Sequence, residues 1–488
     1  ALDGDVVDES WAVNGFTLSN AKTSVTGNSG LTIDAGAGGV TMGGAVGSTR
    51  ALSGMTMTSG ALTAGAINAG AGGLSVTNSG AGSITGAISG TGGLTKAGAG
   101  TLTLSGSSSY SGATTVNAGT LKIASTGAIY DSGSIASSAT AITTVNTGGI
   151  LELTNWGWAG TGGLGQRFFD ANALVINGGT LRYSGASDSA STRGFTVGTS
   201  GATFDSATSG ITWGLTDAGS GYPTYRSIFN GNVTFSGAGN ITFSHPFTGT
   251  GATLTKNGTG MLTLSGANTF TGGTNINAGT LNVNSSGALG SSGTLSFGGG
   301  TLQYSANNNT DYSSRASNAA SQAYKIDTNG RDVTWTSALT SSGGTLTKLG
   351  TGTLTLTGTN TFAGDTTITA GTLQLGNGGS TGSLASTNIV DNGTLAFNTN
   401  VDTTGAYNIS GTGGLQVTGI TRGSALYSGY LTTTPVNIAN DSTVAEVLYR
   451  LSGARESGTA ITGTPQAGIY FKTFNPLTNT ANAQVQMY

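Results

Sequence analysis

Aliphatic and polar residues alternate with a period of two along much of the chain. In "TLTLSG", Leu102 and Leu104 alternate with Thr101 and Thr103, and a serine and a glycine follow. The stretch "TTVNAGTLKI" after it repeats this alternation. Aliphatic residues that alternate with Thr or Ser between Gly, Asn and Ser are typical of short strands with one buried face. The pattern therefore predicts an all-β protein whose short strands are joined by glycine-rich turns.

One stretch with this pattern occurs three times without a gap, at residues 94–123, 254–283 and 346–375. The first copy begins "LTKAGAGTLTLSG", and the others keep its order of residue types. Three kinds of position recur: a lysine (Lys96, Lys256, Lys348), an aromatic residue (Tyr110, Phe270, Phe362) and the glycine of "AGTL" (Gly119, Gly279, Gly371). Low-complexity sequence does not keep such a register, so these stretches are predicted to be a structural repeat.

Short strands, tight turns and a recurring unit predict a solenoid whose coils bury one shared core. We expect a right-handed parallel β-helix, with Leu, Val and Ile stacked inside and ladders of Thr and Ser outside. A β-sandwich array is the alternative, and it would need longer strands and more aromatic core residues. The predicted organisation is an N-terminal arm or cap at 1–30, the solenoid at 31–420 and a C-terminal cap or assembly segment at 421–488.

The composition narrows the choice of function. Charged residues make up 8% of the chain and the net charge is −3, which gives no sign of a nucleic-acid partner. Hydrophobic residues make up 36%, more than a disordered chain carries. No cysteine is present, so the fold has no disulfide and no thiolate metal site. No apolar run is long enough for a membrane-spanning helix.

The stretch "GTGGLTKAGAGTLTLSGSSSYSGATTVNAGTL" resembles the autotransporter-associated β-strand repeat, also called the passenger-associated transport repeat. The resemblance is strong in the three copies and diffuse across the rest of the predicted solenoid. It implies a secreted β-helical protein exposed at the surface of a bacterium. The repeat of that family contains no catalytic residue, so the resemblance assigns none to this chain.

The first two copies are separated by a longer segment than the last two, and residues 124–247 are interpreted as an aromatic-rich insertion that bulges from the solenoid. Five of its aromatic residues form a candidate surface for a glycan or protein ligand: Trp156, Trp158, Trp213, Tyr222 and Tyr225. The alternative, which the sequence favours, is a small satellite core beneath long loops.

Both ends of the chain contain candidate assembly residues: Val6, Val7, Trp11, Val13 and Phe16 near the start, and Tyr470, Phe471, Phe474 and Tyr488 near the end. An end cap is the simpler interpretation, since a solenoid must protect its open edges. Thr443 and Glu446 have capping-box spacing and predict a helix that ends at Gly453.

Candidate chemistry is sparse. Asp3, Asp5, Asp8 and Glu9 cluster near the start, but they lack the spacing of an EF-hand, and a solvated segment is the favoured interpretation over a calcium site. The chain has one histidine, His245, which excludes His-clustered metal sites and weakens any His-based nucleophilic mechanism. Other acids are scattered singly, although coiling could bring two together. We expect no enzyme activity, no cofactor and no metal.

The sequence therefore predicts a structural, non-catalytic, secreted β-solenoid subunit. We expect it to assemble with copies of itself, head to tail, into an extracellular filament or surface layer. The alternative is a monomeric adhesin or autotransporter passenger that binds glycan or protein at the cell surface. An enzyme that acts on polysaccharide ranks third.

Overall fold

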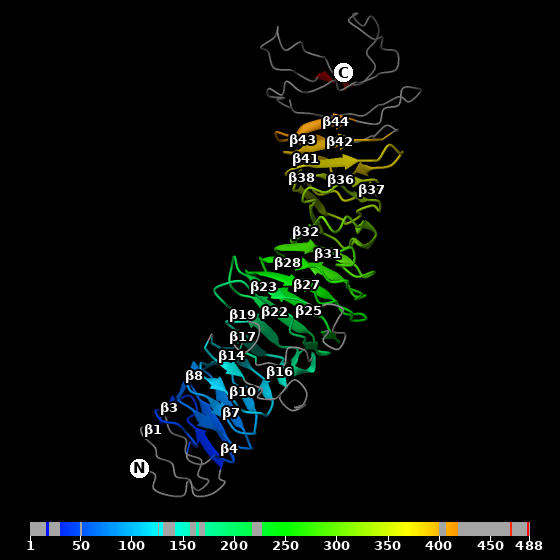
Figure 1. Ribbon diagram of the computed structural model, residues 1–488. Helices are drawn as coiled ribbons and strands as arrows, with labels where there is room; N and C mark the ends of the chain where they lie inside the picture. The colour runs from blue at the N-terminus through cyan, green and yellow to red at the C-terminus, as the bar shows by residue number, and fades with distance from the viewer. Residues whose placement is uncertain are drawn as a thin grey trace, which may run out of the picture. The chain divides into compact units, whose positions relative to one another are not determined.

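The computed structural model describes residues 16–18, 30–48, 51–124, 126–129, 142–156, 163–164, 171–216, 227–399, 407–417, 469–470 and 486–487. The chain divides into two compact units: unit 1 contains residues 1–273 and 287–292, and unit 2 contains residues 274–286 and 293–488. Within the described residues the regular structure is β-strand (Figure 1), apart from two short 3-10 turns, η1 (Ala171–Ala173) and η3 (Ser313–Arg315). The helix predicted before Gly453 lies outside the described residues.

Unit 1 is a stack of coils whose strands form parallel sheets. Sheet 1 consists of β2 (Gly30–Asp34), β4 (Gly54–Ser59), β7 (Leu74–Asn78), β10 (Leu94–Ala97), β13 (Thr114–Val116), β16 (Thr143–Asn146), β18 (Leu174–Asn177), β21 (Thr196–Val197) and β24 (Ile228–Phe229). Sheet 2 consists of β1 (Phe16–Leu18), β3 (Val40–Met42), β5 (Leu62–Ala64), β8 (Gly82–Ile84), β11 (Thr101–Leu104), β14 (Gly119–Ile123), β17 (Gly149–Leu153), β19 (Thr180–Tyr183), β22 (Ala202–Ser206), β25 (Val233–Ser236) and β27 (Leu254–Lys256).

Shorter strands complete the coils of unit 1. Two parallel pairs are β6 (Ile67–Asn68) with β9 (Ile88–Ser89) and β12 (Ser107–Ser108) with β15 (Ala128–Ile129). Sheet 3 follows with β20 (Ser189–Ser191), β23 (Thr212–Leu215), β26 (Asn240–Phe243) and β28 (Met261–Leu264). In sheet 1, Leu94 lies opposite Leu74 on one side and Thr114 on the other, so equivalent positions of successive coils are about 20 residues apart here.

Unit 2 has the same construction. Sheet 4 consists of β30 (Thr280–Val283), β32 (Thr301–Gln303), β33 (Ala323–Asp327), β35 (Thr345–Leu349), β38 (Thr366–Ile368), β41 (Asn388–Asp391) and β43 (Asn408–Ser410). Sheet 5 consists of β34 (Val333–Trp335), β36 (Thr353–Leu356), β39 (Thr372–Leu375), β42 (Thr394–Phe397) and β44 (Gly414–Val417). Two short parallel pairs add β29 (Thr274–Ile276) with β31 (Leu295–Phe297) and β37 (Thr359–Asn360) with β40 (Ser383–Leu384).

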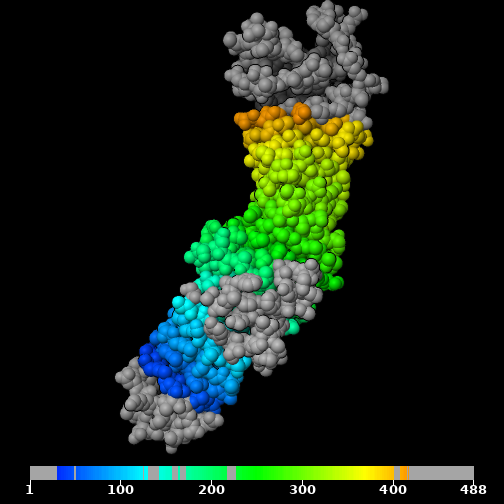
Figure 2. All heavy atoms as spheres, viewed as in Figure 1, coloured from blue at the N-terminus to red at the C-terminus, as the bar shows by residue number. Residues whose placement is uncertain are grey.

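The predicted parallel β-solenoid is confirmed. Strand partners in the coils are parallel, and a separate pair, β45 (Ile469–Tyr470) with β46 (Gln486–Met487), is antiparallel. Within each unit the colour in Figure 2 changes gradually from coil to coil, because each coil contacts the coils just before and after it in the sequence.

The alternation of residue types sorts side chains between the core and the surface. In β11, Leu102 and Leu104 are buried, while Thr101 and Thr103 remain partly accessible. Leu102 lies opposite Leu121 of the next coil, and Leu121 lies opposite Leu151. Each buried leucine of such a column contributes about 1.5–3 kcal/mol through the hydrophobic effect. The predicted inner stacks of aliphatic residues and outer ladders of threonine and serine are therefore confirmed.

One repeat spans two coils. In residues 94–123, the first half (β10 and β11) pairs in parallel with the second half (β13 and β14). In residues 346–375, β35 and β36 pair in the same way with β38 and β39. The repeat is thus a stretch of sequence that stacks on itself, which explains why its length exceeds that of one coil.

The described strands of residues 124–247, a range predicted as an insertion that bulges from the solenoid, lie in the coils of the solenoid instead. They extend the two existing sheets, since β16 pairs with β13 in sheet 1 and β17 pairs with β14 in sheet 2. The strands that follow, up to β26, continue the same stack or add sheet 3. These coils are less regular than the repeat coils and do not show the repeat motif, so the sequence pattern does not reveal them.

Candidate functional site

The repeat lysine lies inside the solenoid. Lys96 occupies an inward position of β10, between Val76 of the preceding coil and Val116 of the next, and its exposed fraction is 0%. Its Nζ donates hydrogen bonds to the carbonyl oxygens of Ala97 (2.6 Å), Gly98 (2.8 Å) and Ala118 (3.1 Å). An ammonium group has three N–H donors, so every donor has an acceptor. Burial is thereby compensated by charge-assisted hydrogen bonds.

The third copy repeats this arrangement. Lys348 lies between Ile326 and Ile368, and its Nζ donates to the carbonyl oxygens of Leu349 (2.9 Å), Gly350 (2.7 Å) and Ala370 (3.1 Å). Burial lowers the pKa of Lys348 to about 8, although Asp327 and Asp332 raise it. Below that pH the side chain is a cation held by backbone dipoles.

In the second copy, Lys256 is also buried and donates to the carbonyl oxygen of Gly258. Burial lowers the pKa of both Lys256 and Lys96 to about 8. Lys256 belongs to sheet 2, whereas Lys96 belongs to sheet 1, so the motif is not tied to one face of unit 1. Sequence reasoning noted that the lysine recurs but missed its role. The sequence did contain a sign of this role, because the alternation of aliphatic and polar residues places the lysine at an inward position.

Four charged side chains form a ladder on the outer face of sheet 2, which we call the charge ladder. Lys122, Glu152, Arg182 and Asp205 lie directly opposite one another on successive strands. Lys122 Nζ lies 2.7 Å from Glu152 Oε1, Arg182 Nη1 lies 3.7 Å from Glu152 Oε2, and Arg182 Nε lies 2.7 Å from Asp205 Oδ2. Cross-strand pairs of opposite charge favour this order of coils.

Both carboxylates of the charge ladder have further partners. Ser184 Oγ donates to Glu152 Oε1 at 2.7 Å, and Ser236 Oγ donates to Asp205 Oδ1 at 3.2 Å. Burial alone would raise the pKa of Glu152, but hydrogen bonds from Lys122 and Ser184 and the charges of Lys122 and Arg182 lower it below its usual range. Glu152 therefore stays ionised, which suits an ion-paired structural group and opposes a role as a general acid.

Sequence reasoning missed the charge ladder because its members are far apart in the chain. Coiling brings them together, as was foreseen for carboxylates in general, but it also places a cation between Glu152 and Asp205. Across the residues that the structure describes, no three His, Cys, Asp or Glu side chains gather in a way that could hold a metal ion.

The candidate ligand surface is wrong for two of its residues. Trp156 is 2% exposed and Trp213 is 0% exposed, so neither can meet a ligand from solution. Their rings meet edge to face with centroids 5.4 Å apart, and Trp213 stacks on Tyr183 at 5.9 Å. Both lie in the solenoid core, because large rings lose more water-exposed area there than any outer position allows. Trp158, Tyr222 and Tyr225 lie outside the described residues.

The two tryptophans belong to an aromatic core that fills the coils of unit 1 after the first repeat. Its other buried rings include Tyr183, Phe195, Phe204, Phe229, Phe235, Phe243 and Phe247. Phe204 stacks on Phe235 with centroids 5.6 Å apart, and Phe229 meets Phe247 edge to face at 4.8 Å. The satellite core favoured from the sequence is thus replaced by rings in the main core.

His245 is enclosed by this aromatic core. Its ring lies 5.1 Å from that of Phe195 and 5.7 Å from that of Phe243, measured between centroids. Nδ1 lies 3.2 Å from Ser227 Oγ, and no hydrogen-bond partner reaches Nε2 among the described residues. Burial lowers the pKa of His245 to about 3, so the ring is neutral at physiological pH.

The predicted assembly residues are mostly outside the described part of the chain. Phe16 lies in β1, which pairs in parallel with β3, and Tyr470 lies in β45. The rest lie outside the described residues: Val6, Val7, Trp11, Val13, Phe471, Phe474 and Tyr488. The acidic cluster of Asp3, Asp5, Asp8 and Glu9 also lies outside them.

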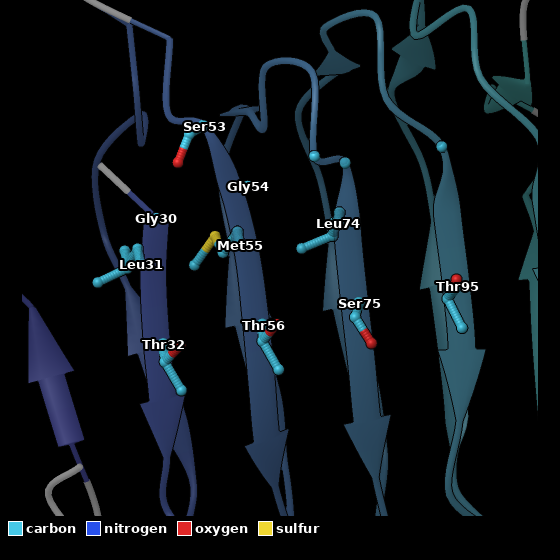
Figure 3. A pocket seen from close by; sticks show the side chains of 13 residues that line it. Gly30, Leu31, Thr32, Ser53, Gly54, Met55, Thr56, Leu74, Ser75 and Thr95 are labelled. Carbon is cyan, nitrogen blue, oxygen red and sulfur yellow. The ribbon is translucent and has the colours of Figure 1, made fainter. Parts of the chain in front are cut away.

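A hollow of about 330 Å³ lies where strands of sheet 1 begin (Figure 3). Its lining includes the glycines Gly30, Gly54, Gly72, Gly73 and Gly93. Figure 3 shows that hydroxyl-bearing side chains on successive strands point to the same side: Thr32, Thr56, Ser75 and Thr95. The hollow offers hydroxyl and backbone groups to a ligand, and no charged or aromatic side chain is among the described residues that line it.

These features define a β-solenoid protein with buried, hydrogen-bonded repeat lysines and outer hydroxyl and charge ladders. Residues 94–123, 254–283 and 346–375 match the family model of the passenger-associated transport repeat, so the chain carries three copies of that repeat. No curated protein and no solved structure matched the chain. Among the described residues, no helix has the length and apolarity needed to cross a membrane.

Proposed function

We propose that the protein is a structural, non-catalytic subunit that assembles head to tail into an extracellular filament or surface layer. The repeats and the solenoid fold are those of an autotransporter passenger-like protein, and the repeat family suggests a secreted or cell-surface location in a bacterium. Neutral, hydroxyl-rich outer ladders and a net charge of −3 favour contact with copies of the same chain or with glycans over nucleic acid.

The pairing of β1 with β3 carries this proposal. Phe16 lies opposite Val40 and Leu18 lies opposite Met42, in parallel register. The arm at residues 1–30 therefore contains a strand that extends sheet 2 beyond its first coil. We infer that the same kind of pairing joins the arm of one copy to the coil edge of another, as in strand addition.

Parallel sheets suit such a joint. Among the described strands, β2 stands first in sheet 1, and β43 and β44 stand last in sheets 4 and 5. A parallel stack presents opposite edges at its two ends, so one end can pair with the other end of a second copy. This contact is heterologous and does not close, which produces a filament.

The absence of catalysis is part of the proposal. The carboxylates of Glu152 and Asp205 are held by cations on the same sheet, and the pKa of Glu152 is lowered by them. His245 is enclosed by aromatic rings and cannot reach a substrate. Glu152, Asp205 and His245 thus serve the fold better than they would serve a reaction.

Electron microscopy of the purified full chain tests the assembly. We expect periodic filaments, and isolated rods at every protein concentration would contradict the proposal. Deletion of residues 1–20 removes β1 and should abolish the filaments. Thr17→Pro removes a backbone N–H within β1 and should shorten or abolish them, whereas Thr17→Ser should have no effect. Filaments that persist after the deletion would exclude the arm as the joint.

A monomeric passenger is the second candidate, and the match to the transport repeat favours it. It predicts a single particle size at all concentrations, with or without residues 1–20. If this passenger is an adhesin, Trp158→Ala should lower its binding to glycans or cells, while the buried Trp156 should affect binding only through stability.

A further inference from the structure

The repeat lysine contacts two coils at once. Two of the acceptors of Lys96 lie in its own coil: Ala97 is the last residue of β10, and Gly98 follows in the turn. The third acceptor, Ala118, belongs to the equivalent turn of the next coil. Lys348 divides its hydrogen bonds in the same way, with Ala370 as the acceptor in the next coil. One side chain thus ties the corners of two successive coils.

Neighbouring positions of the same inward column cannot provide this link. Val76 and Val116 flank Lys96, and Ile326 and Ile368 flank Lys348. The side chains of these aliphatic residues join adjacent coils by apolar contact alone, beside the backbone ladder that all strands share. If the second coil of a repeat separated from the first, the buried ammonium would lose one acceptor and part of its cover. That loss is larger than the loss of one apolar contact, because a buried charge needs its partners.

The corner of the second coil is shaped for this contact. Gly371 follows the acceptor Ala370 and has a φ of 69°. A Cβ atom there would lie 2.8 Å from Lys348 Nζ and 2.5 Å from the carbonyl oxygen of Gly350. Gly119 follows Ala118 with a φ of 61° and is equally crowded by backbone. The lysine and the later "AG" of the repeat therefore form one contact, although they are far apart in the motif.

We propose that the repeat lysine is a coil-to-coil clamp that makes the two coils of one repeat open as a single cooperative unit. The clamp spans residues 94–123 in unit 1 and residues 346–375 in unit 2. Coil pairs without a lysine in this column, such as β4 with β7, open independently of each other. This division of the solenoid into clamped and unclamped pairs holds whether or not the chain forms filaments.

Native-state hydrogen exchange of the full chain tests the clamp. In the unmodified protein, backbone amides of β10 and β13 should report the same opening free energy, while amides of β4 and β7 should report different values. Lys96→Met keeps the bulk of the side chain and removes the donors. We expect it to raise exchange in β13 and β14 by a factor of about 10 to 100, and exchange in β10 by less.

Two controls separate the clamp from simple core filling. Val116→Ala, in the same column, should raise exchange in both coils equally and leave them matched. Lys122→Met, on the outer face of β14, should leave the match unchanged. If β10 and β13 differ in the unmodified protein, or stay matched in Lys96→Met, the proposal is wrong. Lys348→Met repeats the test on β35 and β38, so the proposal can still be tested if one of the two variants fails to fold.

Discussion

Two regions of unit 1 share one backbone ladder but fill it differently. The repeat coils at residues 94–123 bury aliphatic residues and a lysine whose three donors all have acceptors. The aromatic coils that follow bury stacked rings, and three of their polar atoms, Trp156 Nε1, Trp213 Nε1 and His245 Nε2, have no partner among the described residues. The repeat relies on matched polar contacts, and the aromatic coils rely on the area of large side chains.

This difference explains why one region shows a motif and the other does not. A lysine that must reach three carbonyl groups requires fixed spacing of glycine, alanine and strand residues. Rings that pack against one another tolerate other arrangements, provided that the volume is filled. The same parallel stack can therefore continue through sequence that no longer resembles the repeat.

The largest expected effect is in the aromatic coils. Trp213→Ala removes a ring that contacts Trp156, Tyr183 and Phe204, and it should lower the free energy of unfolding by about 3–5 kcal/mol. Denaturant unfolding followed by circular dichroism measures this loss. Leu102→Ala in the repeat coils is the matched comparison, with an expected loss of about 2–5 kcal/mol. A Trp213 variant as stable as the native chain would mean that the aromatic coils do not contribute to the cooperative core.

Acid should weaken the aromatic coils before the repeat coils. The pKa of His245 falls from 6.5 to about 3 on burial, so the unfolded chain binds a proton that the folded chain rejects between these values. Stability from this group is complete above pH 6.5 and declines as the pH falls toward 3. The decline should reach about 2.5 kcal/mol between pH 6 and pH 4.

Denaturant unfolding at several pH values measures this decline, and His245→Gln is the control because it cannot titrate. The two proteins should differ in how steeply the free energy of unfolding changes with pH. This difference separates the effect of the histidine from that of carboxylates such as Glu152, which titrate in both proteins. If the free energy of unfolding depends on pH equally in both proteins, His245 gains a proton without disturbing the fold.

The charge ladder links the two regions, since Lys122 belongs to the first repeat and Asp205 to an aromatic coil. Glu152→Gln leaves Lys122 and Arg182 without their shared anion, and we expect a loss of about 1–3 kcal/mol. Thermal unfolding at low and high salt measures it, and Lys122→Met should cost less because Lys122 is more exposed. If Glu152→Gln and Lys122→Met lower the stability by the same amount, the charge ladder acts as separate ion pairs.

The smallest expected effect concerns the buried indole N–H of Trp213, which contrasts with the fully hydrogen-bonded lysine of the repeat coils. Trp213→Phe removes an indole N–H that has no partner among the described residues, together with some ring volume, so loss of this buried donor offsets the lost packing. We expect a change of about 1 kcal/mol or less in the free energy of unfolding. A larger loss, measured by the same denaturant unfolding, would indicate that volume outweighs hydrogen-bond satisfaction in these coils.

Much of the fold followed from local sequence. The alternation of Leu102 and Leu104 with threonines predicted which side chains are buried, and the three aligned copies predicted a stack of coils. The site was harder to predict. The sequence left Trp156 and Trp213 between a candidate surface and the favoured satellite core, because aromatic residues outside a motif have no phase that marks them as inward.

By itself the sequence determined that this protein is a parallel β-solenoid of short strands with glycine corners, because strand period and turn chemistry are local properties. The tertiary structure alone decided that the repeat lysine points inward and meets the next coil. It also decided that Lys122, Glu152, Arg182 and Asp205 form one ladder. Stacking brings together residues that are one coil or more apart, and their pairing depends on how many residues each coil contains.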